Sequence, residues 1–228
     1  MYTLHIANKN YSSWSLRPWL LMRMLDIPFE EVLHVFGEPD DWAAYRETNP
    51  SGLVPALVHR DGLVWDSMAI TEYLAEHHAG VWPREPQVRR WARCAAAEMH
   101  AGFTELRAVC SMNCGIRVAL KQVSPGLSRD LARLDELWQD GLARFGGPFL
   151  AGDAFTAVDA FYAPVAFRIQ TFDLALTPAS NAYARRLLEL TPMQDWYRQA
   201  LEEPYRDEPH DAEIAAVGDI TEDLRAQA

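Results

Sequence analysis

Cysteine is scarce in this chain of 228 residues, and no stretch of it is continuously apolar for the length of a membrane-spanning helix. The three cysteines, Cys94, Cys110 and Cys114, form no CxxC pair, and no histidine or cysteine lies at the spacing that completes a zinc site. We therefore expect buried thiols without a bound metal, a reducing, cytoplasmic setting, and no membrane partner.

Positive charge is also in short supply. The chain has 21 lysines and arginines against 32 aspartates and glutamates, which gives a formal net charge of −11. A chain with this charge repels phosphate backbones and anionic membranes, which argues against a nucleic-acid partner. With 49% hydrophobic and 23% charged residues, it is typical of a soluble globular protein with one large or two modest cores. We expect a small molecule or another protein as its partner.

Residues 1–80 carry the pattern of a small α/β domain. Residues 2–7 alternate with the period of two that is typical of a strand, and a helix begins between Ser13 and Ser15 with Pro18 in its first turn. Next the patterns predict a strand, a short helix, two strands joined by a turn at Asp61-Gly62, and a helix, at residues 29–35, 41–46, 53–59, 63–66 and 67–77. A βαβ unit followed by a ββα unit within about 80 residues is the order of a small α/β domain.

The second part of the chain has helical patterns instead. A linker with two prolines, residues 81–86, separates it from the first part, and we expect an all-α helical bundle over residues 87–228. The periodicity predicts helices at residues 88–109, 127–145, 156–172, 179–190 and 193–202. The acidic tail from Pro204 is expected to be extended or partly mobile.

Val54-Pro55 stands inside an apolar run that otherwise predicts a strand. A proline there removes a ladder donor, and a cis bond before it is one explanation, because it turns the N–H and C=O of Val54 outward. An extended peptide ligand can pair with those groups as an added strand does. The alternative is an ordinary edge-strand proline with no ligand.

Asp66 and Ser67 open the predicted helix at residues 67–77. A helix N-terminus offers free N–H groups and a partial positive charge for a carboxylate, while the acidic Asp66 can receive an ammonium group beside it. Together they fit an amino-acid head group. The alternative is that both residues only cap the helix.

Hydroxyl groups gather at the start of the first helix, where Ser12, Ser13 and Ser15 follow Tyr11. Hydroxyl and N–H donors at a helix start favour an anionic sulfur over a thiol. This start, the sequence Val-Pro-Ala-Leu from Val54, and Asp-Ser-x-Ala-Ile-x-Glu-Tyr-Leu from Asp66 follow one another in the order found in cytosolic glutathione transferases, which the chain resembles over nearly its whole length.

That resemblance implies a thioredoxin-like glutathione-binding domain, a helical domain, a homodimer, and glutathione as co-substrate for a small electrophile. Ser12 corresponds to the residue that activates the thiol. The expected glutathione contacts are Ser13, Trp14, Arg17, Val54, Pro55, Asp66, Ser67 and Asn113. The expected substrate contacts are Arg107, Met112 and Arg168. The Ser-Ser start is similar to the zeta class, but Trp14 stands where that class has a cysteine, which argues against zeta-type isomerisation.

Thr156 and Asp159 form a capping-box pattern at the start of the helix predicted for residues 156–172, with the apolar Phe155 before it. We expect this pair to stabilise the fold and not to act in catalysis.

Three functions stay open on the sequence. The first is a transferase that ionises bound glutathione for attack on an electrophile. The second is a glutathione-dependent cis-trans isomerase of the maleylacetoacetate or maleylpyruvate type, with Arg17, Arg107 and Arg168 holding the diacid. The third is a binding protein that keeps the fold without catalysis.

Overall fold

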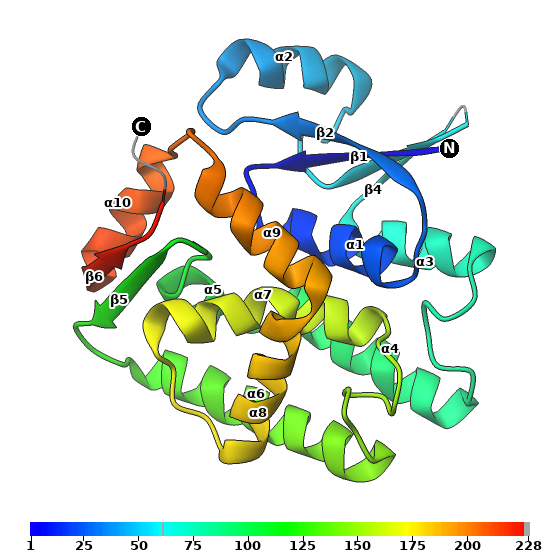
Figure 1. The fold of residues 1–228 in the computed structure, drawn as a ribbon, viewed down its shortest axis with the longest axis vertical. Helices are drawn as coiled ribbons and strands as arrows, with labels where there is room; N and C mark the ends of the chain where they lie inside the picture. Colours follow the sequence, from blue (N-terminus) through cyan, green and yellow to red (C-terminus); the bar gives the residue numbers. More distant parts are fainter. Residues whose placement is uncertain (61, 226–228) are drawn as a thin grey trace.

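The computed structural model describes residues 1–60 and 62–225, so Asp61 of the predicted turn lies outside the described residues (Figure 1). The first part contains β1 (Tyr2–Ala7), α1 (Ser13–Met24), β2 (Phe29–His34), α2 (Pro39–Thr48), β3 (Ala56–His59), β4 (Gly62–Trp65) and α3 (Ser67–His77). The second part contains α4 (Pro86–Ala101), α5 (Thr104–Val109), β5 (Ile116–Leu120), α6 (Pro125–Phe145), α7 (Ala157–Phe172), α8 (Pro178–Glu189), α9 (Thr191–Glu202), α10 (Glu208–Val217) and β6 (Gly218–Asp223).

The first part is the predicted βαβ and ββα arrangement. Its sheet has the order β2-β1-β3-β4, in which β1 runs parallel to β2 and antiparallel to β3. Helix α2 covers one face of this sheet, and α1 and α3 cover the other, where the helical part packs (Figure 1). The boundary predicted at residue 80 falls between α3 and α4, and the one at residue 87 falls in the first turn of α4; the division into domains stays a prediction.

Helix α7 is the centre of the second part. All of its residues are buried except Ile169 and Gln170, because the helix packs against α1, α4 and α8 on different sides. Its first turn is held by Asp159, whose Oδ2 accepts a hydrogen bond of 3.0 Å from the N–H of Thr156. This is the carboxylate half of the predicted capping box.

The prediction of a single helix over residues 88–109 is wrong, because the structure has two helices there. Helix α4 ends at Ala101 and α5 begins at Thr104. Between them Phe103 has a φ of 51°, which a helix does not allow, and a Cβ on Gly102 would lie 2.8 Å from the carbonyl oxygen of Glu98. The break turns α5 toward the site described below.

The tail from Pro204 is not extended as predicted. It forms α10 and β6, and β6 pairs antiparallel with β5 in a two-stranded ribbon that the helical bundle was not expected to contain. Asp207 caps α10. Gly218 permits the close approach of the strands, because a Cβ there would lie 2.4 Å from Val118 Cγ1. Arg225 then fastens the end of the tail to Asp211 of α10, at 2.8 Å.

The loop between β1 and α1 is held by the far end of the helical part. The indole N–H of Trp196 donates to the carbonyl of Lys9 at 2.9 Å, and the carboxylate of Glu203 accepts from the N–H of Lys9 at 2.8 Å and from that of Asn10 at 3.4 Å. Burial raises the pKa of Glu203. These contacts fix the segment that leads into Ser12. No helix in the described part of the chain is long and apolar enough to cross a membrane.

Candidate active site

A cavity of about 380 Å³ lies where the start of α1 meets the end of α5 and the first turn of α10. Its walls combine hydroxyl groups, aromatic rings and two arginines from segments far apart in the sequence. The lining residues are Tyr11, Ser12, Ser13, Trp14, Phe36, Trp42, Leu53, Val54, Arg107, Ser111, Met112, Arg168, His210 and Glu213.

Two of the three candidate serines line this cavity. Ser12 is the N-cap of α1, and its Oγ accepts from the N–H of Ser15 at 3.4 Å and donates to the Oγ of Ser15 at 2.7 Å. Ser15 is fully buried and binds the N–H of Ala7, so it orients Ser12 and does not reach the cavity. Ser12 and Ser13 therefore remain as hydroxyl groups beside the positive end of a helix.

Val54 lies at the cavity and Pro55 behind it. The bond between them is cis, as predicted, and the β3 ladder begins only at Ala56. The preceding carbonyl of Leu53 accepts from the hydroxyl of Tyr45 at 2.9 Å and from the amide of Asn49 at 2.9 Å. Helix α2 thus holds this turn in place.

Asp66 and Ser67 form a second group at the start of α3, beside the cavity but not among the residues that line it. The Oδ1 of Asp66 accepts from the N–H of Met68 at 2.9 Å, while its Oδ2 lies 3.2 Å from Nε2 of His100. The side chain of Asp66 is 51% exposed. Ser67 is buried, and its Oγ accepts a hydrogen bond of 3.5 Å from Nη1 of Arg17.

Arg17 connects the two groups. Its guanidinium carbon lies 4.1 Å from the ring centre of Trp14 and 4.9 Å from that of Phe161, and the side chain is 1% exposed. Burial, together with the positive charges of Arg107 and Arg168, lowers the pKa of Arg17 to about 9. Its Nε has no hydrogen-bond partner among the described residues.

Arg107 and Arg168 add two more cations. Arg168 is buried and donates to the carbonyl of Cys110 and, at 3.4 Å, to the Oγ of Ser13, while Arg107 stacks over Trp14 at 5.4 Å. Burial lowers the pKa of Arg168 to about 10. Within residues 1–60 and 62–225, no carboxylate forms an ion pair with any of the three arginines. The site is therefore locally cationic in an acidic protein and can attract an anion.

Met112 lines the cavity, but Asn113 does not. The amide of Asn113 is fully buried, donates to Asp211 at 3.2 Å and accepts from the N–H of Gly115 at 3.2 Å. Those contacts support the C-terminal tail. A role for Asn113 in touching a ligand would need these bonds to change.

Sequence reasoning missed part of the walls, above all Phe36, Trp42, His210 and Glu213. The last two belong to α10, within the tail that was expected to be extended. A signal existed, since Asp207 followed by Glu208 and Pro209 is a helix start with a proline in the first turn. In the described part of the chain, no three His, Cys, Asp or Glu side chains are grouped as metal ligands.

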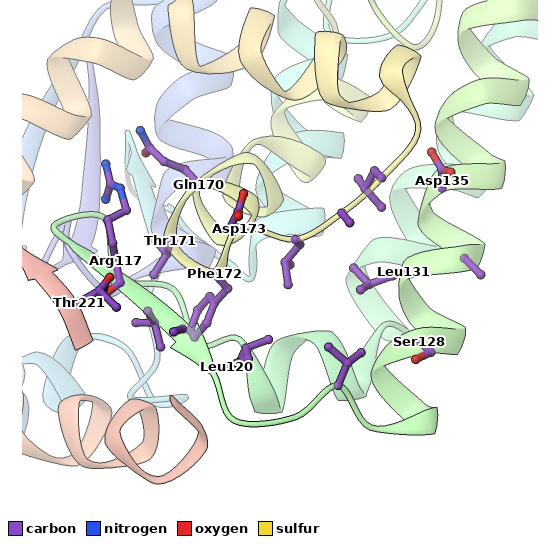
Figure 2. A pocket seen from close by; sticks show the side chains of 17 residues that line it. Arg117, Leu120, Ser128, Leu131, Asp135, Gln170, Thr171, Phe172, Asp173 and Thr221 are labelled. Carbon is purple, nitrogen blue, oxygen red and sulfur yellow. Dashed lines mark hydrogen bonds between the residues drawn. The ribbon is translucent and has the colours of Figure 1, made fainter. Parts of the chain in front are cut away.

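A larger hollow, of about 820 Å³, lies elsewhere, between β5, α6 and the end of α7 (Figure 2). Arg117, Leu131 and Phe172 are among its walls. None of the predicted site residues lines it. Asp135 is already engaged by Thr177 and Ser180, so size alone does not make this hollow the site.

Comparison with characterised proteins agrees with the fold. Among curated relatives, a probable maleylacetoacetate isomerase from Caenorhabditis elegans is 26% identical over 175 residues, which cover 73% of this chain and 78% of the relative. A stringent starvation protein A homolog from Pasteurella multocida is 28% identical over 163 residues, covering 68% and 70%.

Solved structures share the fold at low identity. A glutathione transferase homolog from Burkholderia GL BGR1, crystallised with bound glutathione, has a TM-score of 0.65 at 19% identity and covers 87% of this chain and 97% of its own. A diazinon-metabolizing glutathione S-transferase from the silkworm Bombyx mori has a TM-score of 0.70 at 15% identity, with coverage of 88% and 97%.

Two family models match the chain in sequence order. Residues 11–77 match the N-terminal domain of glutathione S-transferase, and residues 118–199 match its C-terminal domain. Together they cover more than half of the chain and contain Ser12, Val54, Asp66 and Arg168. The chain belongs to the glutathione S-transferase family.

Proposed function

We propose that this protein binds glutathione, ionises its thiol beside Ser12, and transfers it to a small electrophile held in the cavity. The observation that carries the proposal is the start of α1, where Ser12 and Ser13 line a cavity whose arginines have no carboxylate partner in the described chain. Hydroxyl donors, a helix N-terminus and unpaired cations all favour charge on sulfur.

The glutathione itself would extend from the cavity to the start of α3. Its γ-glutamyl ammonium group would meet the exposed carboxylate of Asp66, and its carboxylate the N-terminus of α3 at Ser67. Val54, which lines the cavity, would pair with the cysteinyl backbone. The buried Arg17, which lies between Trp14 and Ser67, would support both ends.

An isomerase is the second candidate. Arg17, Arg107 and Arg168 supply cations for a dicarboxylate, and the Caenorhabditis elegans relative carries the name of a maleylacetoacetate isomerase. In this reaction the thiolate adds to the substrate and leaves again, so glutathione is not consumed. Trp14, where the zeta motif has a cysteine, argues against it.

A binding protein without catalysis is the third candidate. Three relatives carry the name stringent starvation protein A homolog, which names neither a transferase nor an isomerase. The serines at the start of α1 favour the two enzymatic readings over this one.

Free thiol and substrate, followed together, separate the three. Glutathione would be incubated with chloronitrobenzenes and with maleyl diacids, with the parent protein, Ser12→Ala, and Ser128→Ala as a matched serine at the larger hollow. The transferase proposal expects thiol to fall in step with electrophile, a loss of about 100-fold in Ser12→Ala, and no change in Ser128→Ala.

Other outcomes of that experiment point elsewhere. Conversion of the diacid at constant total thiol would replace the transferase with the isomerase. Glutathione binding with neither reaction would leave the binding protein.

We also propose that the protein is a cytoplasmic homodimer joined through the exposed faces of α3 and α4. Trp65, next to the N-cap of α3, is 49% exposed, so an apolar side chain beside α3 is left uncovered in a single chain. Sedimentation equilibrium should give twice the chain mass, and the mass of one chain at micromolar concentration would contradict the dimer.

A further inference from the structure

Helix α10 brings His210 to the cavity, and Asp207, the residue before the helix, contacts it; both lie beyond the residues that the family models match. Asp207 is 7% exposed and caps the helix, and its Oδ2 accepts from the N–H of His210 at 3.3 Å and is also bonded to Nδ1 of the same residue. A carboxylate on Nδ1 keeps the proton on that nitrogen and leaves Nε2 as an acceptor.

The imidazole of His210 is held on two sides. Its ring is stacked on Phe36, with ring centres 5.4 Å apart and planes at 30°, and it lies 5.4 Å from the ring of Tyr11, the residue before Ser12. Among the described residues no hydrogen bond engages Nε2. An oriented and unoccupied base therefore lines the same cavity as the serines.

Ser12 cannot take that role. Its hydroxyl donates to Ser15, and after rotation it can donate to a thiolate, but a serine hydroxyl does not accept a proton from a thiol at neutral pH. Ser13 is bound by Arg168 and is equally weak as a base. A histidine that lines the same cavity offers the proton an acceptor within the protein in place of water.

We propose that His210 is the general base that deprotonates glutathione in this cavity, and that Asp207 is its positioning residue. The S–H bond breaks, the proton forms an N–H bond at Nε2, and the electron pair stays on sulfur. The thiolate then forms the S–C bond, the leaving group departs with its electron pair, and the imidazolium returns the proton to that group or to water.

Charged groups surround His210. Asp207 is hydrogen-bonded to its Nδ1, and the exposed Glu213 lies one turn further along α10 and lines the same cavity. The guanidinium of Arg225 is engaged by Asp211 at 2.8 Å, by Asp223 at 2.7 Å and by the hydroxyl of Tyr11 at 3.1 Å. The opposing cations are Arg107 and Arg168, which line the cavity with His210.

This inference rests on the proposed binding of glutathione, and the test keeps the two apart. Glutathione is titrated into the parent, His210→Gln and Asp207→Asn at pH 7.5, with thiolate absorbance in the ultraviolet and calorimetry in two buffers of different ionisation enthalpy. His77→Gln, an exposed histidine near the end of α3, is the control, and thermal unfolding checks each fold.

A base inside the protein keeps the proton of the thiol. The parent should therefore show thiolate absorbance while releasing less than about half a proton to the buffer per glutathione bound. His210→Gln should lose about tenfold of that absorbance with its dissociation constant within about threefold of the parent. In Asp207→Asn the pH midpoint of thiolate formation should rise without loss of binding, which a merely structural role would not produce.

The contradicting results differ for the two claims. If the parent binds no glutathione, the proposed function fails and the base fails with it. If the parent binds and forms thiolate but His210→Gln forms it equally, or if the parent releases a full proton with each thiolate, only the base is overturned. Asp207→Asn decides the matter should His210→Gln not fold.

Discussion

Helices α7 and α3 each have an aspartate at their start, and the two side chains lie in opposite environments. Asp159, in the first turn of α7, is fully buried, and its oxygens accept hydrogen bonds from Leu150 N at 3.0 Å, Thr156 N at 3.0 Å and Tyr183 Oη at 2.8 Å. Asp66, the N-cap of α3, is half exposed, and its Oδ2 lies 3.2 Å from Nε2 of His100.

The difference teaches what a helix-start signal can decide. In both places the sequence places an acid where free N–H groups need an acceptor. Only the exposed Asp66 can accept hydrogen bonds from a ligand, because the carboxylate of Asp159 is occupied by donors of the protein itself. Asp159 should therefore control the stability of the fold, and Asp66 the binding of a ligand.

Replacing Asp159 should have the largest effect on folding. Asp159→Ala leaves three buried donors without an acceptor, and the free energy of unfolding should fall by about 3–5 kcal/mol. Urea denaturation followed by tryptophan fluorescence measures it. The nearby exposed Asp153→Ala is the control and should stay within about 0.5 kcal/mol. A loss below about 1 kcal/mol in Asp159→Ala would remove the contrast between the two aspartates.

The pH dependence of stability should carry the mark of Asp159. Burial raises its pKa from 3.8 to about 6, against hydrogen bonds that lower it. A pKa raised by folding adds stability that is complete below the unfolded value and is lost as the pH rises through about 6. From pH 7 to pH 5 the parent should gain about 1–2 kcal/mol relative to Asp159→Asn, which binds no proton. A loss of stability between pH 7 and pH 5, relative to Asp159→Asn, would contradict the raised pKa.

Replacing Asp66 should cost the least stability. Asp66→Ala removes a cap on an exposed helix end and should lower the free energy of unfolding by about 1 kcal/mol. Asp66→Asn keeps a capping oxygen and should change the free energy of unfolding by only about 0.3 kcal/mol. The same denaturation experiment measures both. A loss as large as that of Asp159→Ala would mean that Asp66 is structural after all.

Local signals in the sequence predicted much of the fold and part of the candidate site. The alternation in β1, the serine before α1 and the acid before α3 each act within a few residues, so their elements lie where they were expected. The proline in an apolar run also marked the cis bond before Pro55. The roles proposed for these residues remain predictions.

What the sequence did not predict depends on contacts between distant segments. β5 pairs with β6 about 100 residues later, and a local pattern carries no information on that choice of partner. Likewise Phe103, between α4 and α5, adopts a left-handed conformation that its residue type does not favour. His210 enters the cavity only because Asp211 and Arg225 fix the tail against Tyr11.

The central claim is that glutathione binds at the starts of α1 and α3, and calorimetric titration of the parent, Asp66→Asn and Asp66→Ala tests it most directly. The account predicts saturable binding by the parent, weakened about 10–100-fold in both variants, because both lose the charge that meets the ammonium group and only one loses the cap. Equal affinity in all three proteins, or no binding by the parent, would contradict it.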